Sequence, residues 1–339
     1  MEKVALVTGA AGFVGQALVL RLLEKDFTVK ALDLPENPEF SKFIDSLPAL
    51  QQSSLIPCPA DITNADALKS ILTGVSYVFH TAALLNSVAP RSRFESVNVQ
   101  GTINICNAAS DAGVERFILV STSDVFGIPR RSEVITEKTA YRSWGEPYAD
   151  TKIQACNIVK GFQQKGLLKT TIIYPGWVYG PGDRQFFPAI IEMIKDKHAF
   201  IWHKTEPYCV DLIYINDLIS AIVTAAELPA AIGEDYLILD DNTKITPEEF
   251  FHHIAEQLHI KLKIHKLPYQ IMYTVAWISQ QLKQRGFIKN LLLSTTDVKA
   301  FGNNFEFSNK KARNALQWAP SVSAKEGINI ALDWQNRNN

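Results

Sequence analysis

Short apolar runs rich in β-branched residues alternate with longer amphipathic stretches through the first half of the chain. Each short run predicts a β-strand, and the runs cover 3–8, 28–33, 53–58, 75–80, 116–121 and 169–174. The stretches between them predict helices at 12–25, from the capping-box pattern of Thr63 and Asp66 onward, at 93–113, and around Tyr148. Strands that alternate with helices are typical of a parallel sheet, so the expected fold class is α/β with a doubly wound sheet.

The alternation loosens after residue 175. Predicted helices there lie near 186–197, 216–227, 246–258, 268–285 and 322–335, with short strands between them. Neither a repeat nor a low-complexity linker divides the chain. We therefore expect a main sheet domain over 1–175 and a smaller α/β substrate region over 176–339, with chain segments crossing between the two.

Composition narrows the range of partners. The chain of 339 residues has 34 Lys and Arg against 35 Asp and Glu, so no nucleic-acid surface is expected. Its cysteines, Cys58, Cys106, Cys156 and Cys209, lack metal-ligand spacing and predict a reduced, cytoplasmic protein without a metal site. No apolar run reaches the roughly 18 residues that a bilayer requires, so no transmembrane segment is expected.

A glycine-rich turn follows the first predicted strand in "TGAAGFVG", with Gly9, Gly12 and Gly15. Such a turn at a helix start lets the backbone approach a pyrophosphate. Asp33 ends the second predicted strand and can accept hydrogen bonds from ribose hydroxyls, while it would repel a 2′-phosphate. We therefore predict NAD rather than NADP. A structural turn with an unrelated aspartate is the weaker alternative, because the strand and helix context is present.

The later strand ends also carry candidate residues. Asp61 in "ADIT" comes where an adenine would lie, although a turn or cap explains it nearly as well. The small residues of "HTAA" (80–83) let the backbone pass under a cofactor, or simply pack. Hydroxyls in "VSTSDVFG" (120–127) can bond a substrate carbonyl, or cap a turn. Several such features in order at strand ends count for more than each one alone.

Tyr148 and Lys152 lie four residues apart, just after Pro147, and so share one helix face. An ordinary surface helix would explain this pair taken alone. A phenol has a pKa of about 10, and a nearby ammonium and the nicotinamide ring both favour the phenolate. Together with the glycine turn, the pair predicts Tyr148 as a general base, with Lys152 lowering its pKa and holding the nicotinamide ribose.

The chain resembles the extended short-chain dehydrogenase/reductase superfamily over about residues 4 to 183. The matching motifs are, in the family's order, "TGAAGFVG", Asp33, "ADI", "HTAA", "VNVQGT", "VSTSDVFG", "YADTK" and "YPGWVYGPGD". The resemblance implies a Rossmann-type fold with an NAD-binding domain over 1–175. It also implies a catalytic triad of Thr122, Tyr148 and Lys152, with Ser123 in reserve.

The resemblance extends to cofactor and substrate sites. The implied cofactor residues are Gly9, Ala11, Gly12, Phe13, Val14, Gly15, Asp33, Asp61, Ile62, Thr81, Ala82, Ala83, the supporting Asn98, Tyr148, Lys152, Pro175 and Val178. The implied substrate residues are Leu84, Ser123, Trp177 and Phe186.

The tail narrows the choice within the superfamily. "LPYQIMYTVAWISQQL", "FSNKKARNALQWAPSVSAKEGINIALDW" and "GPGDRQFFPAIIEMI" resemble the 3β-hydroxysteroid dehydrogenase and epimerase/dehydratase branch, with dihydroflavonol reductases as near neighbours. The superfamily commonly has arginine at the position of Tyr174. Nucleotide-sugar epimerases usually carry an asparagine within the segment "YPGWVYGP" and an arginine before "CVDLIYI". This chain has Gly176 and Trp177 in that segment and no arginine between Arg184 and Arg285, which disfavours a UDP-sugar.

An apolar, aromatic lid is expected over the substrate, although core packing also explains each member separately. Its members are Trp177, Phe186, Phe187, Trp202, Tyr208, Met272 and Trp277. The expected activity is NAD-dependent hydride transfer to or from a hydrophobic secondary alcohol or ketone, with a 3β-hydroxysteroid as the leading type. Alternatives are a nucleotide-sugar epimerase or dehydratase, a dihydroflavonol-type reductase, and a dinucleotide sensor, which would not need the Tyr148–Lys152 pair. Amphipathic 268–285 fits either helix packing or a membrane surface.

A homodimer is expected because the helices near 93–113 and 148–165 resemble the pair that forms a four-helix interface in this superfamily. Its apolar contacts would be Ile103, Cys106, Ile158 and Phe162, unless these residues face the chain's own sheet.

Overall fold

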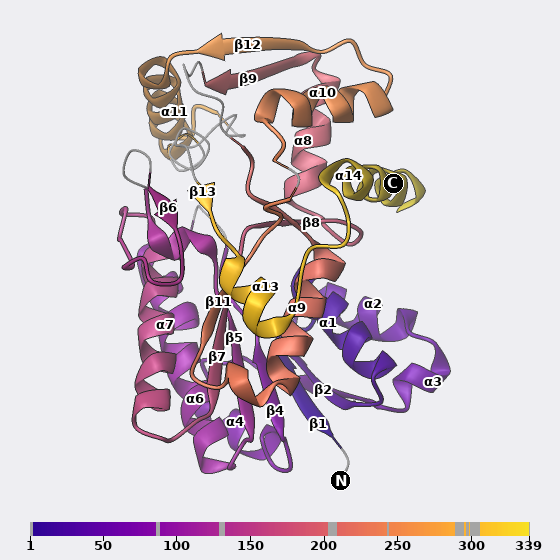
Figure 1. Cartoon of the computed structure of the whole chain (residues 1–339), viewed down its shortest axis with the longest axis vertical. Helices are drawn as coiled ribbons and strands as arrows, with labels where there is room; N and C mark the ends of the chain where they lie inside the picture. The colour runs from indigo at the N-terminus through magenta and orange to yellow at the C-terminus, as the bar shows by residue number, and fades with distance from the viewer. Residues whose placement is uncertain are drawn as a thin grey trace.

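The computed structural model describes residues 3–85, 89–128, 133–202, 209–242, 244–288, 295, 298 and 306–338. Seven strands form one parallel sheet in the order β11-β7-β5-β4-β1-β2-β3 (Figure 1). Their bounds are β1 Val4–Thr8, β2 Thr28–Asp33, β3 Leu55–Pro59, β4 Tyr77–His80, β5 Arg116–Val120, β7 Thr170–Pro175 and β11 Asp235–Ile238. The chain therefore has the predicted α/β, Rossmann-type fold.

Helices cover both faces of this sheet, which explains why its strands are almost wholly apolar. One face carries α4 (Ala65–Ile71), α6 (Gly101–Asp111) and α7 (Pro147–Gln164), and the other carries α1 (Phe13–Glu24) and α9 (Ile215–Glu227) (Figure 1). Beside β2 and β3 lie α2 (Pro38–Ser46) and α3 (Ala49–Gln52). All five residues of β5 are buried, as expected for a strand covered on both sides.

One predicted helix cap is wrong, and one predicted helix differs in detail. Asn64, not Thr63, caps α4, since its side chain accepts a hydrogen bond from Ala67 N at 3.3 Å, while Asp66 pairs with Lys69. The helix predicted at 93–113 begins earlier, as α5 (Arg91–Phe94), and passes through a π-helical turn (Glu95–Gln100) before α6. This extra-wide turn bears on the site, because it contains Asn98.

The remaining elements are short strand pairs and helices outside the seven-stranded sheet. Short parallel pairs join β8 (Trp177–Tyr179) to β10 (Leu212–Tyr214), β9 (His198–Trp202) to β12 (Lys263–Leu267), and β6 (Val134–Ile135) to β13 (Glu306–Phe307). The helices are α8 (Phe186–Lys195), α10 (Pro247–Gln257), α11 (Tyr269–Gln284), α13 (Lys310–Leu316) and α14 (Ala324–Asn338), with 3₁₀ turns at Ser123–Phe126 and Pro229–Ala231.

We call α8, β9, α10, β12 and α11 the upper lobe, because they lie together at the top of Figure 1. Although they follow residue 175, α9 and β11 return to the main sheet, so the chain crosses between the two parts. None of the helices in the described part of the chain is long and apolar enough to cross a membrane.

One expected dimer contact is wrong. Cys106 is completely buried against the chain's own sheet, in the same cluster as Cys156 and Val159, so it offers no surface to a partner. Ile158 and Phe162 are partly buried against that cluster.

Candidate active site

The turn from β1 to α1 can be built only with glycines at two positions. Gly9 has a positive φ of 69°, and a Cβ there would lie 2.8 Å from Ala82 Cα. A Cβ on Gly15 would lie 2.0 Å from the carbonyl oxygen of Gly9. The backbone is thereby drawn tightly around the amino end of α1, where Phe13 and Val14 form the first turn. This is a geometry that accepts a phosphate.

Asp33 lies at the end of β2 and is fixed beside this turn. Its Oδ2 accepts a hydrogen bond from Ala11 N at 2.8 Å, and its Oδ1 accepts from Leu34 N and Asn37 Nδ2, both at 2.9 Å. The next basic residue along the chain, Lys42, pairs with Glu39 at 2.9 Å. The carboxylate is therefore held as an acceptor for ribose hydroxyls, with its negative charge facing any 2′-phosphate.

Asp61 and Ile62 have structural roles at the end of β3. The Oδ1 atom of Asp61 accepts from Thr63 N at 2.8 Å, which is the turn role considered for it. Ile62 is buried, and a Cβ on Gly101 would lie 2.5 Å from its Cδ1 atom. Contact of Asp61 with an adenine stays a prediction.

A buried histidine links the ends of β1 and β4, and its place in "HTAA" was the only feature that distinguished it in the sequence. His80 Nδ1 lies 2.8 Å from Thr8 Oγ1, and its Nε2 lies 3.0 Å from Thr102 Oγ1. Thr102 donates its only hydroxyl proton to Asn98 O at 2.7 Å, so it accepts from His80 Nε2–H. Nδ1 then accepts from Thr8.

This hydrogen-bond chain ties the segment after β4 to the sheet. Thr8 Oγ1 accepts from Ala82 N at 3.2 Å, and Thr81 Oγ1 donates to Thr8 O at 2.6 Å. Burial, with a smaller contribution from Lys152, lowers the pKa of His80 to about 3, so the imidazole is neutral at pH 7.

Asn98 supports the same segment from the π-helical turn. Its Oδ1 accepts from Leu84 N at 2.7 Å, and its Nδ2 donates to Leu84 O at 3.3 Å and to Thr151 Oγ1 at 3.1 Å. It therefore joins the main chain that follows Ala83 to α7, the helix that carries Tyr148. Its expected role in supporting the cofactor site stays a prediction.

The structure brings Thr122, Tyr148 and Lys152 together at the carboxyl end of β5. Thr122 follows the strand in an extended conformation, and its side chain is hydrogen-bonded to that of Tyr148. Lys152 is buried, and its Nζ donates to Val120 O at 2.8 Å. Pro147 occupies the first turn of α7 as predicted, and the next helical turn places Lys152 near Tyr148.

The pKa of Tyr148 does not follow the expected direction within the polypeptide. Burial raises it above its usual value, the charges of Asp124 and Cys156 raise it further, and the hydrogen bond with Thr122 opposes them. Lys152 does not lower it, and burial lowers the pKa of Lys152 itself to about 8. The polypeptide alone therefore holds Tyr148 in its neutral, proton-bearing form at pH 7.

Asp124 is a site residue that sequence reasoning missed. It lies in the turn after β5, hydrogen-bonded to Thr122, and its charge acts on Tyr148. Burial raises its pKa to about 6, the bond with Thr122 opposes this, and Glu146 adds to it. The only signal in the sequence was its place in "VSTSDVFG", next to Ser123, which is buried.

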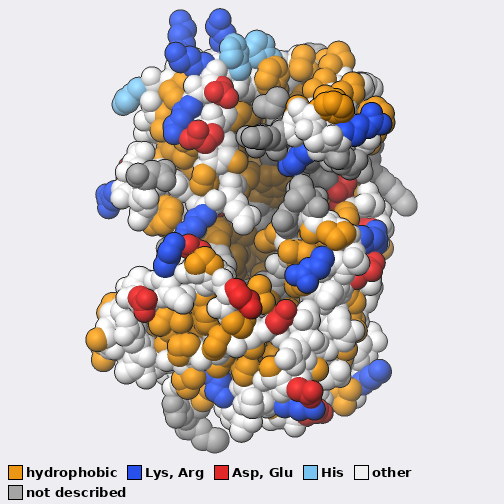
Figure 2. Space-filling view, turned by 180° about the vertical axis from the view of Figure 1, so that it is seen from behind, with side chains coloured by type: hydrophobic (Ala, Val, Ile, Leu, Met, Phe, Trp, Pro, Cys, Tyr) orange, Lys and Arg blue, Asp and Glu red, His pale blue; other side chains and the backbone are white. Residues whose placement is uncertain are grey.

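Two of the residues expected to contact a substrate form a partly exposed aromatic pair. The rings of Trp177 and Phe186 meet edge to face with centroids 4.9 Å apart, and both remain partly exposed. Val178 follows in β8, and Pro175 ends β7. Figure 2 shows the surface hollowed between the sheet and the upper lobe, with apolar side chains inside the hollow.

Other members of the expected lid have different surroundings. Phe187 is fully buried and Met272 is buried, so core packing accounts for both. Trp277 is 53% exposed. Tyr208 and the side chain of Trp202 lie outside the described residues.

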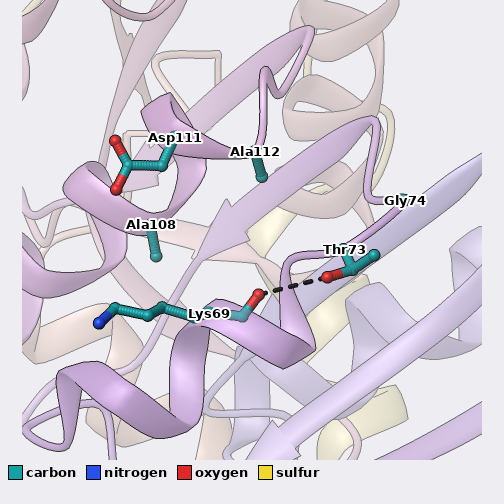
Figure 3. A pocket seen from close by; sticks show the side chains of 6 residues that line it. All are labelled: Lys69, Thr73, Gly74, Ala108, Asp111 and Ala112. Carbon is teal, nitrogen blue, oxygen red and sulfur yellow. Dashed lines mark hydrogen bonds between the residues drawn. The ribbon is translucent and has the colours of Figure 1, made fainter.

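A separate shallow pocket lies at the opposite edge of the sheet. It is lined by Lys69, Thr73, Gly74, Ala108, Asp111 and Ala112, from the ends of α4 and α6 (Figure 3). These residues precede β4 and β5, at the amino ends of the strands. Ligands of open α/β sheets bind at the carboxyl ends, so this pocket is not part of the site.

Comparisons with known proteins agree with this geometry. The sequence profile of the 3-beta hydroxysteroid dehydrogenase/isomerase family matches residues 6–269. The 3-beta-hydroxysteroid dehydrogenase of Mycolicibacterium neoaurum is 28% identical, with 97% of this chain and 90% of the relative covered. The 3 beta-hydroxysteroid dehydrogenase/Delta 5→4-isomerase of Mycobacterium tuberculosis is 29% identical, with 97% and 89% covered.

Solved structures show the same fold. UDP-glucuronic acid 4-epimerase from Bacillus cereus, in complex with UDP-glucuronic acid and NAD, superposes with a TM-score of 0.78. The two proteins are 23% identical, and the match covers 99% of this chain and 100% of the epimerase.

Proposed function

This chain belongs to the 3-beta hydroxysteroid dehydrogenase/isomerase family and is an NAD-dependent oxidoreductase, and from this premise we propose that its substrate is a hydrophobic secondary alcohol or ketone. A 3β-hydroxysteroid or a similar sterol is the leading type. The observation that carries the proposal is the hydrogen-bonded Thr122–Tyr148 pair, with Lys152 buried beside it, at the carboxyl end of β5.

The residues present fit the cofactor. The close glycine turn and the amino end of α1 would hold the pyrophosphate, and Asp33 would accept from the adenosine ribose. Lys152 would hold the nicotinamide ribose. Bound NAD supplies the hydride acceptor for an alcohol, and its reduced form supplies the donor for a ketone.

Proton transfer is assigned to Tyr148. Thr122 orients the substrate oxygen by a hydrogen bond, and Tyr148 removes the hydroxyl proton during oxidation or returns it during reduction. Because the polypeptide raises the pKa of Tyr148, the neutral phenol is ready to donate a proton at pH 7. We therefore expect ketone reduction to tolerate neutral pH and alcohol oxidation to accelerate as the pH rises.

Substrate choice is assigned to the apolar side of the hollow. Trp177 and Phe186 pack edge to face with each other and stay partly exposed, so their rings would offer an apolar wall to a flat hydrocarbon skeleton. A Cβ on Gly176 would lie 2.6 Å from Asp211 O, so a larger side chain such as asparagine does not fit there. This supports a hydrophobic substrate over a UDP-sugar.

Asp124 favours a second activity, namely a proton shift coupled to the oxidation. A carboxyl with a pKa of about 6 exchanges a proton near neutral pH, and it lies one hydrogen bond away from Thr122. A double-bond isomerisation next to the new carbonyl would use such a group.

The test is a hydride-transfer screen. The purified protein is given NAD with 3β-hydroxysteroids, or NADH with dihydroflavonols, and the change in NADH is followed by absorbance. Turnover of UDP-sugars, which need not change the NADH concentration, is followed by chromatography of the products. Tyr148→Phe is the matched control, and NADP in place of NAD tests the cofactor. Turnover of a hydroxysteroid that Tyr148→Phe lacks supports the proposal, whereas turnover confined to UDP-sugars contradicts it.

A further inference from the structure

One helix of the upper lobe exposes an apolar stripe. Ile271, Val275, Ile278 and Leu282 of α11 are each between 38% and 52% exposed. They follow one another at intervals of four, three and four residues, which is the spacing of one helix face. The opposite face, with Met272 and Ala276, is buried with Val298. The exposed stripe is therefore distinct from the face through which α11 packs against the rest of the protein.

Large apolar side chains are concentrated at this helix. Trp277 and Phe287 are also exposed, at 53% and 73%, beside the stripe and just beyond the end of α11. The other exposed large apolar residues in the described part of the chain are spread over many elements. Contiguous exposed apolar surface marks an interaction site, whereas single exposed residues do not.

The stretch of sequence that contains α11 carries charges of one sign. Between Glu256 and Asp297 the sequence contains no acidic residue and six basic ones, in a chain whose net charge is −1. They are Lys261, Lys263, Lys266, Lys283, Arg285 and Lys289. Of the described ones, Lys266 is paired with Glu248 at 2.6 Å, while Lys263 is exposed in β12 and Arg285 ends α11. Figure 2 shows apolar and basic side chains side by side at this end of the molecule.

We propose that α11 lies on the surface of an anionic lipid membrane, with its apolar stripe in the interface and basic side chains among the headgroups. A helix with an apolar face and flanking Lys and Arg has this preference. None of the described helices can cross a bilayer, so the contact is peripheral. A second copy of the chain fits less well, because a two-fold contact would bring the same basic surface against itself.

The location of α11 suggests what the membrane contact would do for the enzyme, and this part of the inference rests on the proposed function. The upper lobe also contains α8, which starts at Phe186, and the ring of Phe186 packs against Trp177. A hydrophobic substrate partitions into lipid, so membrane docking would place the hollow near its source. The docking itself does not depend on which substrate is used.

Vesicle cosedimentation of the full-length protein tests the proposal. Vesicles of phosphatidylcholine alone are compared with phosphatidylcholine containing phosphatidylserine. We expect binding to the anionic vesicles that is about tenfold or more stronger than to the neutral ones, and that weakens as salt is added. Failure of the wild-type protein to bind anionic vesicles at low salt would overturn the proposal.

Variants separate the apolar and electrostatic parts. Val275→Asp/Ile278→Asp should lower vesicle binding more than tenfold, and Lys283→Glu/Arg285→Glu should lower it by about tenfold on anionic vesicles only. Leu50→Asp, at a residue that is 85% exposed in α3, is the matched control and should bind as the wild type does. Wild-type binding by Val275→Asp/Ile278→Asp would contradict the docking surface.

Sedimentation velocity without vesicles tests whether a second copy of the chain, rather than a membrane, binds the apolar stripe of α11. If the wild-type protein self-associates and Val275→Asp/Ile278→Asp abolishes that association, the stripe binds a second copy and the membrane proposal is wrong. Neither measurement uses catalysis, so an error in the proposed function would leave this result unchanged.

Discussion

The carboxyl end of the main sheet and the upper lobe are built by different forces. At the sheet end, polar side chains are tied to the backbone: Asp33 to Ala11, Asn98 to Leu84 and Lys152 to Val120. The upper lobe and its border with the sheet rely on apolar contact, such as Trp177 against Phe186. Hydrogen bonds have narrow ranges of length and direction, whereas apolar contacts tolerate substitution. We infer that chemistry is specified at the sheet end, and substrate choice at the apolar side.

Tyr148→Phe should produce the largest effect, because it removes the group that transfers the proton. The turnover number with the true substrate should fall by about a hundred- to ten-thousand-fold. NAD affinity and the melting temperature should change little, since only one hydroxyl is lost. Steady-state kinetics and calorimetry measure both. Retention of most of the activity would remove Tyr148 from the mechanism and weaken the contrast between the two regions.

Acid should destabilise the sheet end through His80. Its pKa is about 3 in the folded protein and 6.5 in the ordinary state, so the unfolded chain binds more protons between these values. Stability is therefore complete above about pH 6.5 and is lost as the pH falls, by about 1.4 kcal/mol per pH unit at most. Chemical denaturation measures the free energy of unfolding at each pH. This free energy should fall less steeply with decreasing pH in His80→Gln, which cannot titrate.

Asp124 should change stability with pH in the opposite direction to His80, so it serves as the control for that measurement. Its raised pKa of about 6 means that the folded state binds more protons between the usual aspartate value and pH 6. Its contribution to stability therefore falls as the pH rises through this window. In Asp124→Asn the free energy of unfolding should therefore fall more steeply with decreasing pH than in the wild type. An unchanged slope in both variants would show that neither group governs the acid response.

Asp33→Ala should weaken NAD binding by about ten- to a hundred-fold, the usual effect of losing hydrogen bonds to a charged group. It should also relieve the repulsion of a 2′-phosphate and so narrow the preference for NAD over NADP. Titration calorimetry with both dinucleotides measures this. Tighter binding of NADP than NAD by the wild-type protein would contradict the assigned role.

Trp177→Ala should affect the other region alone. Loss of one aromatic wall should lower kcat/KM for a hydrophobic substrate by about tenfold, with NAD affinity unchanged. Trp177→Phe should recover much of the loss. Phe200→Ala, at an exposed ring of β9, is the matched control. An equal loss of NAD affinity in Trp177→Ala would mean that the two regions are not separable.

The smallest expected effect on turnover concerns assembly. We propose a two-fold dimer through the exposed sides of α6 and α7, with Ile158 and Phe162 near the contact. Sedimentation equilibrium should give twice the chain mass of 37.8 kDa, and Ile158→Lys should give the monomer with turnover nearly intact. A wild-type monomer at micromolar concentration would end this proposal.

Local pattern was enough to predict much of the fold. The strand at 28–33 was predicted at its observed bounds, and the five helices predicted after residue 175 lie within a few residues of observed ones, because apolar periodicity and glycine or proline positions act over short distances. The short helix α13 was not predicted. The glycine turn and the spacing of Tyr148 and Lys152 were also visible, since both motifs are local in sequence.

Tertiary structure decided the features that depend on what covers a residue. Phe186 and Phe187 are adjacent, yet only Phe187 is fully buried, and Trp277 is exposed although it is as apolar as the core. The tautomer of His80 depends on Thr8 and Thr102, which are far from it in sequence. The pKa of Tyr148 rises because of burial, while the charge of Lys152, which sequence spacing suggested would lower it, does not act in that way. Periodicity tells which side chains share a face, but only long-range packing determines whether protein, substrate or solvent lies against that face.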